Sequence, residues 1–411
     1  MVNEKPLAVA EARARVLAAA RTIRDSETIP LGEALGRTLA ADLTAKRTQP
    51  PASVSAMDGY ALRAADVAVL PAKLKLIGES AAGHGFAGSV AAGECVRIFT
   101  GAPVPDGADA VLMQEFAEAD GTSISPQRTV PKGDFIRAAG LDFSEGDRLL
   151  AAGTVLGPAE MALAAAMNHA MLPVIRRPRV AILATGDELV PPGAEIGPDQ
   201  IVASNGFAIA GYVRLAGGQV IDLGIAGDDF AAIETGIRRA REARADVLVT
   251  LGGASVGDHD LVKSALAKEG MELGFWRIAM RPGKPLIHGR MGEMSILGLP
   301  GNPVSAIVCG IVFLVPLVRA LCGASDGEVD TSEAAVLGGP LRANDVRQDF
   351  LRATLRIGAE GQLVATPFPA QDSSLLRVIA QAQCLIVRMP HAPEAKPGDP
   401  CRVVRLPKGY F

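Results

Sequence analysis

A glycine-rich stretch at 246–263 carries residue types that could bind an anion. It reads DVLVTLGGASVGDHDLVK, so an apolar run predicts a short buried strand that Gly252 and Gly253 end abruptly. Apolar residues then recur at helical spacing, and the amides at the start of that helix would attract negative charge. The spacing from Gly252 to Gly257 imitates a Walker A loop, but Asp258 replaces its lysine, which argues against a simple nucleoside triphosphatase. Taken alone, the loop could equally be an ordinary strand-to-helix turn.

The segment around this loop predicts an α/β unit with a mostly parallel sheet. From residue 179 the apolar runs VAILA, QVIDLG, DVLVTL and SILGL alternate with helix-like runs. Ligands in such folds bind beyond the carboxyl ends of the strands, and no GxGxxG motif supports a Rossmann dinucleotide site. Unusual loops follow three of the runs, namely TGDEL (185–189), GGASVGDHD (252–260) and LPGNPVS (299–305).

The rest of the chain predicts further domains around the α/β unit. Its 411 residues favour two to four domains, and the expected fold class is a multidomain α+β protein. Short apolar runs separated by Gly and Pro predict an all-β insertion before the α/β unit and a C-terminal β-barrel-like domain after it. The expected spans are 1–47 with 141–177 (N-terminal helical and linking domain), 48–140 (β-rich insertion), 178–325 (α/β) and 326–411 (C-terminal β domain).

Three shorter segments also carry expectations. An apolar face at 6–23 predicts a helix that packs within the chain or across a dimer. The segment 48–60 is rich in Pro and Ser, and presents Asp58 in a loop. The apolar stretch 306–318 contains Pro316 and is too short to span a bilayer, so we expect a buried helix.

Composition excludes several classes of protein. A net charge of -4 gives no global argument for nucleic acid or for an anionic membrane as partner. The N-terminus lacks the features of a secretion signal. The cysteines include no CxxC pair, which argues against a disulfide framework and a structural zinc site and favours a reducing cytoplasm. They are Cys95, Cys309, Cys322, Cys384 and Cys401.

An ordered series of motifs resembles the signature of the molybdopterin molybdenumtransferases, the MoeA and gephyrin E-domain family. The three loops above belong to it, and further motifs lie on both sides of the glycine loop. Several motifs in the right order are more specific than any single one, and together they cover nearly the whole chain. The further motifs are SAMDGY (55–60), TGAPVP (100–105), GLD (140–142) and RPGKP (281–285).

The resemblance implies the last step of molybdenum cofactor synthesis, in which molybdate and adenylylated molybdopterin give the cofactor and AMP with the help of Mg²⁺. It also implies a homodimer with shared active sites. Bringing two anions together requires a metal, cationic side chains or helix N-termini, and magnesium takes oxygen ligands. The implied catalytic carboxylates are Asp58, Asp142, Glu188, Asp228 and Asp260, of which Asp58, Glu188 and Asp228 would bind the metal.

The resemblance further implies a set of substrate-binding residues drawn from the same motifs. The glycine loop supplies amides, and a cluster after the run GFWRIAM supplies positive charge. The set is Thr100, Thr185, Gly186, Asp187, Ser204, Asn205, Gly252, Gly253, Ser255, Gly257, Arg277, Arg281, Lys284, Pro300, Gly301, Asn302, Pro303 and Ser373.

Each of these residues also has a structural interpretation. Asp187 and Asp228 could cap the segments that follow them, and Asn302 could cap a helix that begins at Pro303. Arg281 could be surface charge, and Lys284 likewise. For Asp58 and Glu188 function is favoured, because no adjacent helix pattern requires them.

The chain departs from the family pattern in two places. Arg277 and Arg281 stand where the family commonly has lysines, which keeps the charge but favours planar contacts to oxyanions. The sequence QDSS (371–374) replaces a QGS-type turn, which weakens the assignment of Ser373 to molybdate. A molybdopterin adenylyltransferase is the alternative enzyme, although it would lack the flanking β segments. A gephyrin-like scaffold is the alternative outside enzymes.

Overall fold

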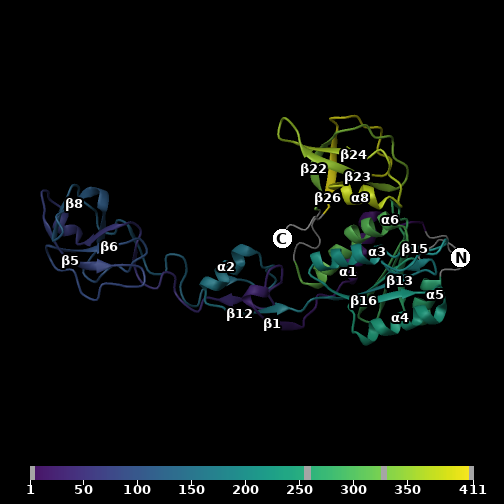
Figure 1. Cartoon of the computed structure of the whole chain (residues 1–411), viewed down its shortest axis with the longest axis horizontal. Helices are drawn as coiled ribbons and strands as arrows, with labels where there is room; N and C mark the ends of the chain where they lie inside the picture. The colour runs from purple at the N-terminus through teal and green to yellow at the C-terminus, as the bar shows by residue number, and fades with distance from the viewer. Residues whose placement is uncertain (1–4, 254–260, 325–330, 407–411) are drawn as a thin grey trace.

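The computed structural model describes residues 5–253, 261–324 and 331–406, and it has an elongated outline (Figure 1). The β-rich insert lies at one end. The α/β domain and the C-terminal β domain lie together at the other end, and a small linking part that contains β1, β12 and α2 lies between. This architecture confirms the multidomain α+β prediction.

A six-stranded sheet forms the centre of the α/β domain. Its first four strands are parallel to one another, β20 runs antiparallel to them, and β18, antiparallel to β20, runs in their direction again, which confirms the mostly parallel prediction. Leu251 pairs with both Ala184 and Leu299, so three neighbouring strands end at the same level. In spatial order the strands are β16 (Gln219–Ala226), β13 (Arg179–Thr185), β17 (Val247–Leu251), β21 (Met294–Leu299), β20 (Pro285–Met291) and β18 (Glu272–Arg277).

Helices cover both faces of this sheet with separate apolar cores. On one face lie α1 (Val9–Ala19), α3 (Asn205–Leu215), α6 (Pro303–Cys309) and α7 (Val315–Leu321). On the other lie α4 (Phe230–Glu242) and α5 (Leu261–Lys268). The buried residues of α1 (Val9, Ala12 and Val16) belong to the first core. The apolar face expected at 6–23 is therefore occupied within the chain and is not available for a dimer contact.

The apolar helix is longer than the sequence indicated. It runs from Pro303 to Leu321 through α6, the π-helical turn η4 (Gly310–Leu314) and α7, and it is long and apolar enough to cross a membrane by length and composition. However, 72% of its apolar window is buried inside the fold. Pro316 does not end the helix, and it follows directly on the π-helical turn, where the hydrogen-bond pattern of the helix changes. The prediction of a buried helix is confirmed, and the whole helix extends beyond the apolar stretch 306–318 at both ends.

The insert has a six-stranded sheet and its own cores, which contain residues of the insert alone. In spatial order its strands are β7 (Ala110–Met113), β4 (Gly59–Leu62), β6 (Glu94–Ile98), β5 (Leu74–Ser80), β9 (Ser123–Pro126) and β8 (Ala117–Ala119). The short pair β3 (Val54–Ser55) and β10 (Ile136–Arg137) joins its ends. Its 3₁₀ turns are η2 (Ala64–Val67) and η3 (Gln114–Phe116).

The linking part is a small unit with one buried cluster. Its members are β1 (Ser26–Pro30) paired with β12 (Met171–Ile175), β2 (Leu43–Thr44) paired with β11 (Arg148–Leu150), η1 (Leu31–Glu33) and α2 (Pro158–Ala166).

The C-terminal domain is a closed β-barrel fastened to the α/β domain. Phe350 and Leu385 belong to the same core as α3 and α6, and β19 (Met280–Arg281) of the α/β segment pairs with β23. The barrel prediction is confirmed. The other elements are β22 (Glu333–Leu337), β23 (Gln348–Ile357), β24 (Leu363–Pro367), β25 (Cys384–Arg388), β26 (Pro400–Arg405) and α8 (Leu376–Gln381). A parallel pair, β14 (Leu189–Val190) and β15 (Ile201–Val202), lies beside α3.

Candidate functional site

A cavity of about 800 Å³ lies beyond the level carboxyl ends of β13, β17 and β21. This is where ligands bind in open α/β sheets, because no strand continues there and helix N-termini point toward the opening. Its lining draws on all three loops that the sequence singled out. The expected residues that line it are Thr185, Gly186, Glu188, Ser204, Asn205, Asp228, Gly252, Gly253, Pro300, Gly301, Asn302 and Pro303.

Two glycines shape the floor of this cavity. Gly252 has φ +99°, and a Cβ added there would lie 2.6 Å from the carbonyl oxygen of Thr185. Gly253 has φ +64°, and a Cβ there would lie 2.2 Å from Cγ2 of Val262. Both the backbone conformation and the space therefore require glycine, and the main chain is exposed directly to whatever occupies the cavity.

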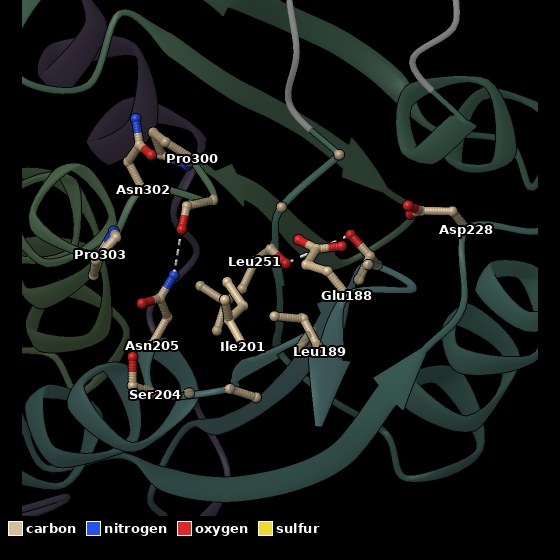
Figure 2. A pocket seen from close by; sticks show the side chains of 18 of the residues that line it. Glu188, Leu189, Ile201, Ser204, Asn205, Asp228, Leu251, Pro300, Asn302 and Pro303 are labelled. Atoms are coloured by element: carbon tan, nitrogen blue, oxygen red, sulfur yellow. Dashed lines mark hydrogen bonds between the residues drawn. The ribbon is translucent and has the colours of Figure 1, made fainter. Parts of the chain in front are cut away.

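Glu188 and Asp228 supply the negative charge of the cavity, and Figure 2 shows both on the side opposite Asn205 and Pro303. Both are exposed, and neither has a basic partner among the described residues. Asp187 lies just outside the lining, where its Oδ1 accepts a hydrogen bond from the amide of Asp228 (2.9 Å). Asp229, not Asp228, caps α4, since its Oδ1 accepts the amide of Ala232. The carboxylate of Asp228 is thus left for another role.

The opposite wall is held by contacts between loops. Nδ2 of Asn205 donates to the carbonyl of Gly301 (2.7 Å; Figure 2), which ties the start of α3 to the loop before α6. Asn302 occupies the N-cap position of α6 but makes no side-chain cap bond. From the C-terminal domain Ser374, rather than Ser373, lines the cavity. The carbonyl of Ser373 instead accepts the amide of Val304 (3.0 Å), so this loop caps α6.

The structure places the expected cations outside this lining. Nε and Nη2 of Arg281 donate to both oxygens of Asp349 on β23, at 2.9 and 2.6 Å, and this pairing raises the pKa of Arg281. The guanidinium of Arg277 stacks on the ring of Trp276, with 3.9 Å to its centroid. Lys284 is exposed. Reversing the charge of Arg281 would set a carboxylate against Asp349, so it would disturb the contact between domains before it reported on any ligand.

A second polar group of residues lies in and beside the insert. Asp58 accepts hydrogen bonds from the amide (2.7 Å) and hydroxyl (2.8 Å) of Thr100, which together lower the pKa of its carboxyl. Asp142 lines a cavity of about 620 Å³ with Gly101, the residue after Thr100. Within one chain the insert lies at the opposite end of the molecule from the α/β domain, and the linking part lies between them (Figure 1).

The positively charged residues that line this 620 Å³ cavity beside the insert were missed from the sequence. They are Arg47 and Arg137, which lie about ninety residues apart in the sequence, and Arg137 is carried by β10, which pairs with β3. Arg352 was missed as well. It is 1% exposed and donates to the carbonyl of Asp372, beneath the loop that carries Ser374. Nothing in an apolar strand pattern marks such a residue as special.

Three expected residues, Ser255, Gly257 and Asp260, lie outside the described part of the chain. Within the described part no group of three or more His, Cys, Asp or Glu side chains could hold a metal ion. Asp58, Glu188 and Asp228 therefore do not form a single metal site in one chain.

Family models match the chain in three consecutive regions. Residues 7–168 match the MoeA N-terminal region (domains I and II), residues 181–320 match a probable molybdopterin binding domain, and residues 334–406 match the MoeA C-terminal region (domain IV). Apart from Ser374, the residues that line the cavity at the strand ends lie in the second of these regions. The fold and the cavity thus define a protein of molybdenum cofactor biosynthesis.

Relatives that match over most of their own length identify the family more narrowly. The molybdopterin molybdenumtransferase of Haemophilus influenzae is 34% identical over 93% of this chain and 94% of its own length. Molybdopterin molybdenumtransferase 2 of Mycobacterium tuberculosis is 36% identical over 87% of this chain and 90% of its own length. A crystal structure of a MoeA protein from Pyrococcus horikoshii matches with a TM-score of 0.84 and 26% identity, covering 98% of this chain and all of the other. The chain belongs to the MoeA family and is a transferase, and the adenylyltransferase alternative is not favoured.

Proposed function

We propose that the chain inserts molybdenum from molybdate into adenylylated molybdopterin and releases AMP. The observation that carries this proposal is the cavity in the molybdopterin-binding region, which combines exposed loop amides, helix starts and two carboxylates with no basic partner among the described residues. A molybdate ion and a phosphoanhydride are both anions, so a site that gathers them has to offset their repulsion.

The chemistry of the lining fits a magnesium ion. Glu188 and Asp228 offer carboxylate oxygens, and Mg²⁺ keeps several waters, so one or two protein carboxylates suffice to hold it. When bound, the ion would neutralise negative charge on the phosphate oxygens of the substrate. Gly252 and Gly253 let the main chain approach the substrate, and Asn205 fixes the loop at Gly301.

The active unit in this proposal is a homodimer with clefts shared between two chains. Asp58, Thr100 and Asp142 carry the second half of the expected site, and within one chain they lie far from Glu188. A partner that brings its insert to the α/β cavity would supply them, and two-fold dimers are the commonest closed assemblies. Because the apolar face of α1 packs within its own chain, that face does not form the contact.

Product analysis tests the reaction directly. Purified protein is incubated with adenylylated molybdopterin, molybdate and Mg²⁺, and mass spectrometry follows AMP and the molybdenum-bound pterin. We expect both products with molybdate present and no molybdenum-bound pterin without it. The Glu188→Ala protein, folded by circular dichroism, should give neither. Formation of adenylylated molybdopterin from ATP, without molybdenum insertion, would assign the chain to the adenylyltransferases instead.

A further inference from the structure

A second cavity, of about 480 Å³, adjoins the one at the strand ends. The two share three lining residues, Ala184 at the end of β13, Ala203 before α3 and Gly206 in its first turn. A single elongated ligand could therefore occupy both. The volume of the second cavity falls in the range of small-molecule sites, roughly 300–1,000 Å³.

The walls of this second cavity are apolar and suit a flat ring. Ile182 and Ala210 are buried at its base. Phe207, which is 67% exposed, and the prolines Pro191 and Pro192 also line it. An exposed aromatic side chain at the edge of an apolar cavity is a stacking surface for a heteroaromatic ring, because every such ring has a π-face.

A bulge in the edge strand completes the cavity. The pairing of β13 with β16 shifts register between Ile182 and Ala184, and Gly224 of β16 has φ +81°. A bulge of this kind re-aims the residues beside it, and Ile225 lines the cavity as a result.

Two charged side chains give the cavity polar selectivity. Oδ1 of Asp222 accepts the amide of Gly224 (2.9 Å), which fixes the carboxylate while Oδ2 has no protein donor among the described residues. The guanidinium of Arg214, from the last turn of α3, likewise has no hydrogen-bond acceptor within that part of the chain. A carboxylate accepts from ring N–H and amino groups, and a guanidinium donates to ring nitrogen or carbonyl oxygen.

We propose that this second cavity binds an amino-substituted fused heteroaromatic ring of the substrate, stacked on Phe207 and read at its edge by Asp222 and Arg214. This proposal rests on the proposed function, because adenylylated molybdopterin contains two such rings, the adenine and the pterin, on either side of the phosphates. Both rings carry an amino group that can donate to Asp222 and an acceptor for Arg214. The phosphates between them would then lie in the first cavity with Glu188 and Asp228.

Binding measurements on the full chain identify which ring it is. Calorimetry with AMP and, separately, with 6-hydroxymethylpterin compares wild type with Phe207→Ala and Asp222→Asn. For one of the two probes we expect each variant to weaken binding by about tenfold, through lost stacking or a lost acceptor. The other probe should bind all three proteins alike. If AMP is the sensitive probe, inosine monophosphate should bind the wild type more weakly, because an exocyclic carbonyl oxygen replaces the amino donor.

Matched variants separate this role from damage to the fold. Leu376→Ala changes a groove that Phe207 also lines but leaves the second cavity intact, and Asp199→Asn changes an exposed carboxylate that lines neither cavity. Both should bind the probes as wild type does. The proposal is overturned if neither probe binds the wild type at millimolar concentration, or if Phe207→Ala and Asp222→Asn bind both probes unchanged. Failure of the proposed function is distinct, since it would appear as wild-type protein that binds a probe yet forms no molybdenum-bound pterin.

Discussion

The five-stranded C-terminal barrel and the six-stranded sheet of the insert are both β units, yet they attach to the α/β domain in opposite ways. The barrel shares an apolar core with α3 and α6, adds the β19–β23 pairing and holds Arg281 through Asp349. The insert has separate cores and reaches the α/β domain through the linking part. The barrel therefore contributes Ser374 to the cavity of its own chain, whereas the insert, which contains Asp58, lies at the opposite end of the molecule from the α/β domain.

This difference indicates how a shared cleft can arise. A domain that shares an apolar core with its neighbour cannot be exchanged between chains without disrupting that core. Buried apolar contacts supply most of the stability of such a core. A unit with its own core can act as an arm. The comparison predicts that the two halves of the expected site behave as separable parts, one fixed and one delivered by a partner.

The largest expected effect comes from breaking both halves in separate chains. Asp58→Ala in the insert and Glu188→Ala in the α/β domain should each reduce molybdenum insertion by orders of magnitude without unfolding the protein. Both carboxylates are exposed, and loss of the Thr100 bonds to Asp58 should lower stability only slightly. After subunit exchange between the two inactive proteins, mixed dimers should recover part of the activity. One of their clefts would carry both lesions and the other neither. The measurement is AMP release by the mixture.

Its control is a mixture of Glu188→Ala with Asp228→Ala. Both residues line the same cavity of one chain, so their mixed dimers should stay inactive. Activity in a strictly monomeric preparation, or no recovery in verified Asp58–Glu188 mixed dimers, would contradict the shared cleft.

A second pair of variants compares glycines in the two regions. Gly252→Ala places a Cβ 2.6 Å from the oxygen of Thr185 at φ +99°, so strain and overlap together should cost about 4 kcal/mol of unfolding free energy. Gly101→Ala, at φ +81°, meets nothing within 4 Å and should cost about 1 kcal/mol through strain alone. Urea unfolding of both proteins measures the difference. Equal losses would mean that the crowding of the α/β loop is not what distinguishes the regions.

A third prediction concerns pH and a buried histidine of the α/β sheet. His288 is 4% exposed, and burial, followed by the charge of Arg290, lowers its pKa to about 4. Between pH 6.5 and about 4 the unfolded chain binds this proton and the folded chain does not. The contribution of His288 to the free energy of unfolding is therefore fully present above pH 6.5, and it decreases by about 3 kcal/mol as the pH drops toward 4.

Replacing the histidine isolates this contribution. His288→Phe keeps a ring beside Phe275 and removes the titration, so its unfolding free energy should change much less between pH 7 and 5 than that of wild type. In the insert the pKa of Asp58 is lowered, so its carboxyl stays ionised throughout this range. If the unfolding free energy of His288→Phe fell with pH as steeply as that of wild type, His288 would be ruled out as the source of the acid sensitivity.

The sequence predicted the parts of the site that follow from the order of strands and loops along the chain. It missed the parts that depend on contacts between residues far apart in the sequence. Strand runs followed directly by TGDEL, GG and LPGNPVS place their loops at one sheet edge by topology alone. The pairing of Arg281 with Asp349, sixty-eight residues later, leaves no local signal, so Arg281 was assigned to the ligand. The separation of Asp58 from Glu188 within one chain depends on how the domains are joined. No single motif shows this, and only the family resemblance led to the expectation of active sites shared between two chains.

The smallest expected effect distinguishes two residues at helix starts that the sequence could not separate. Asp229 accepts the amide of Ala232 at 2.8 Å, so Asp229→Ala should cost about 1 kcal/mol of stability and leave activity near wild type. Asn302 makes no cap bond although it holds the N-cap position of α6, and it lines the cavity. Asn302→Ala should therefore change stability by less than about 0.5 kcal/mol, and any loss of turnover would reflect contact with substrate. Urea unfolding and AMP release, measured on the same preparations, test both statements. A stability loss for Asn302→Ala as large as that for Asp229→Ala would return Asn302 to a purely structural role.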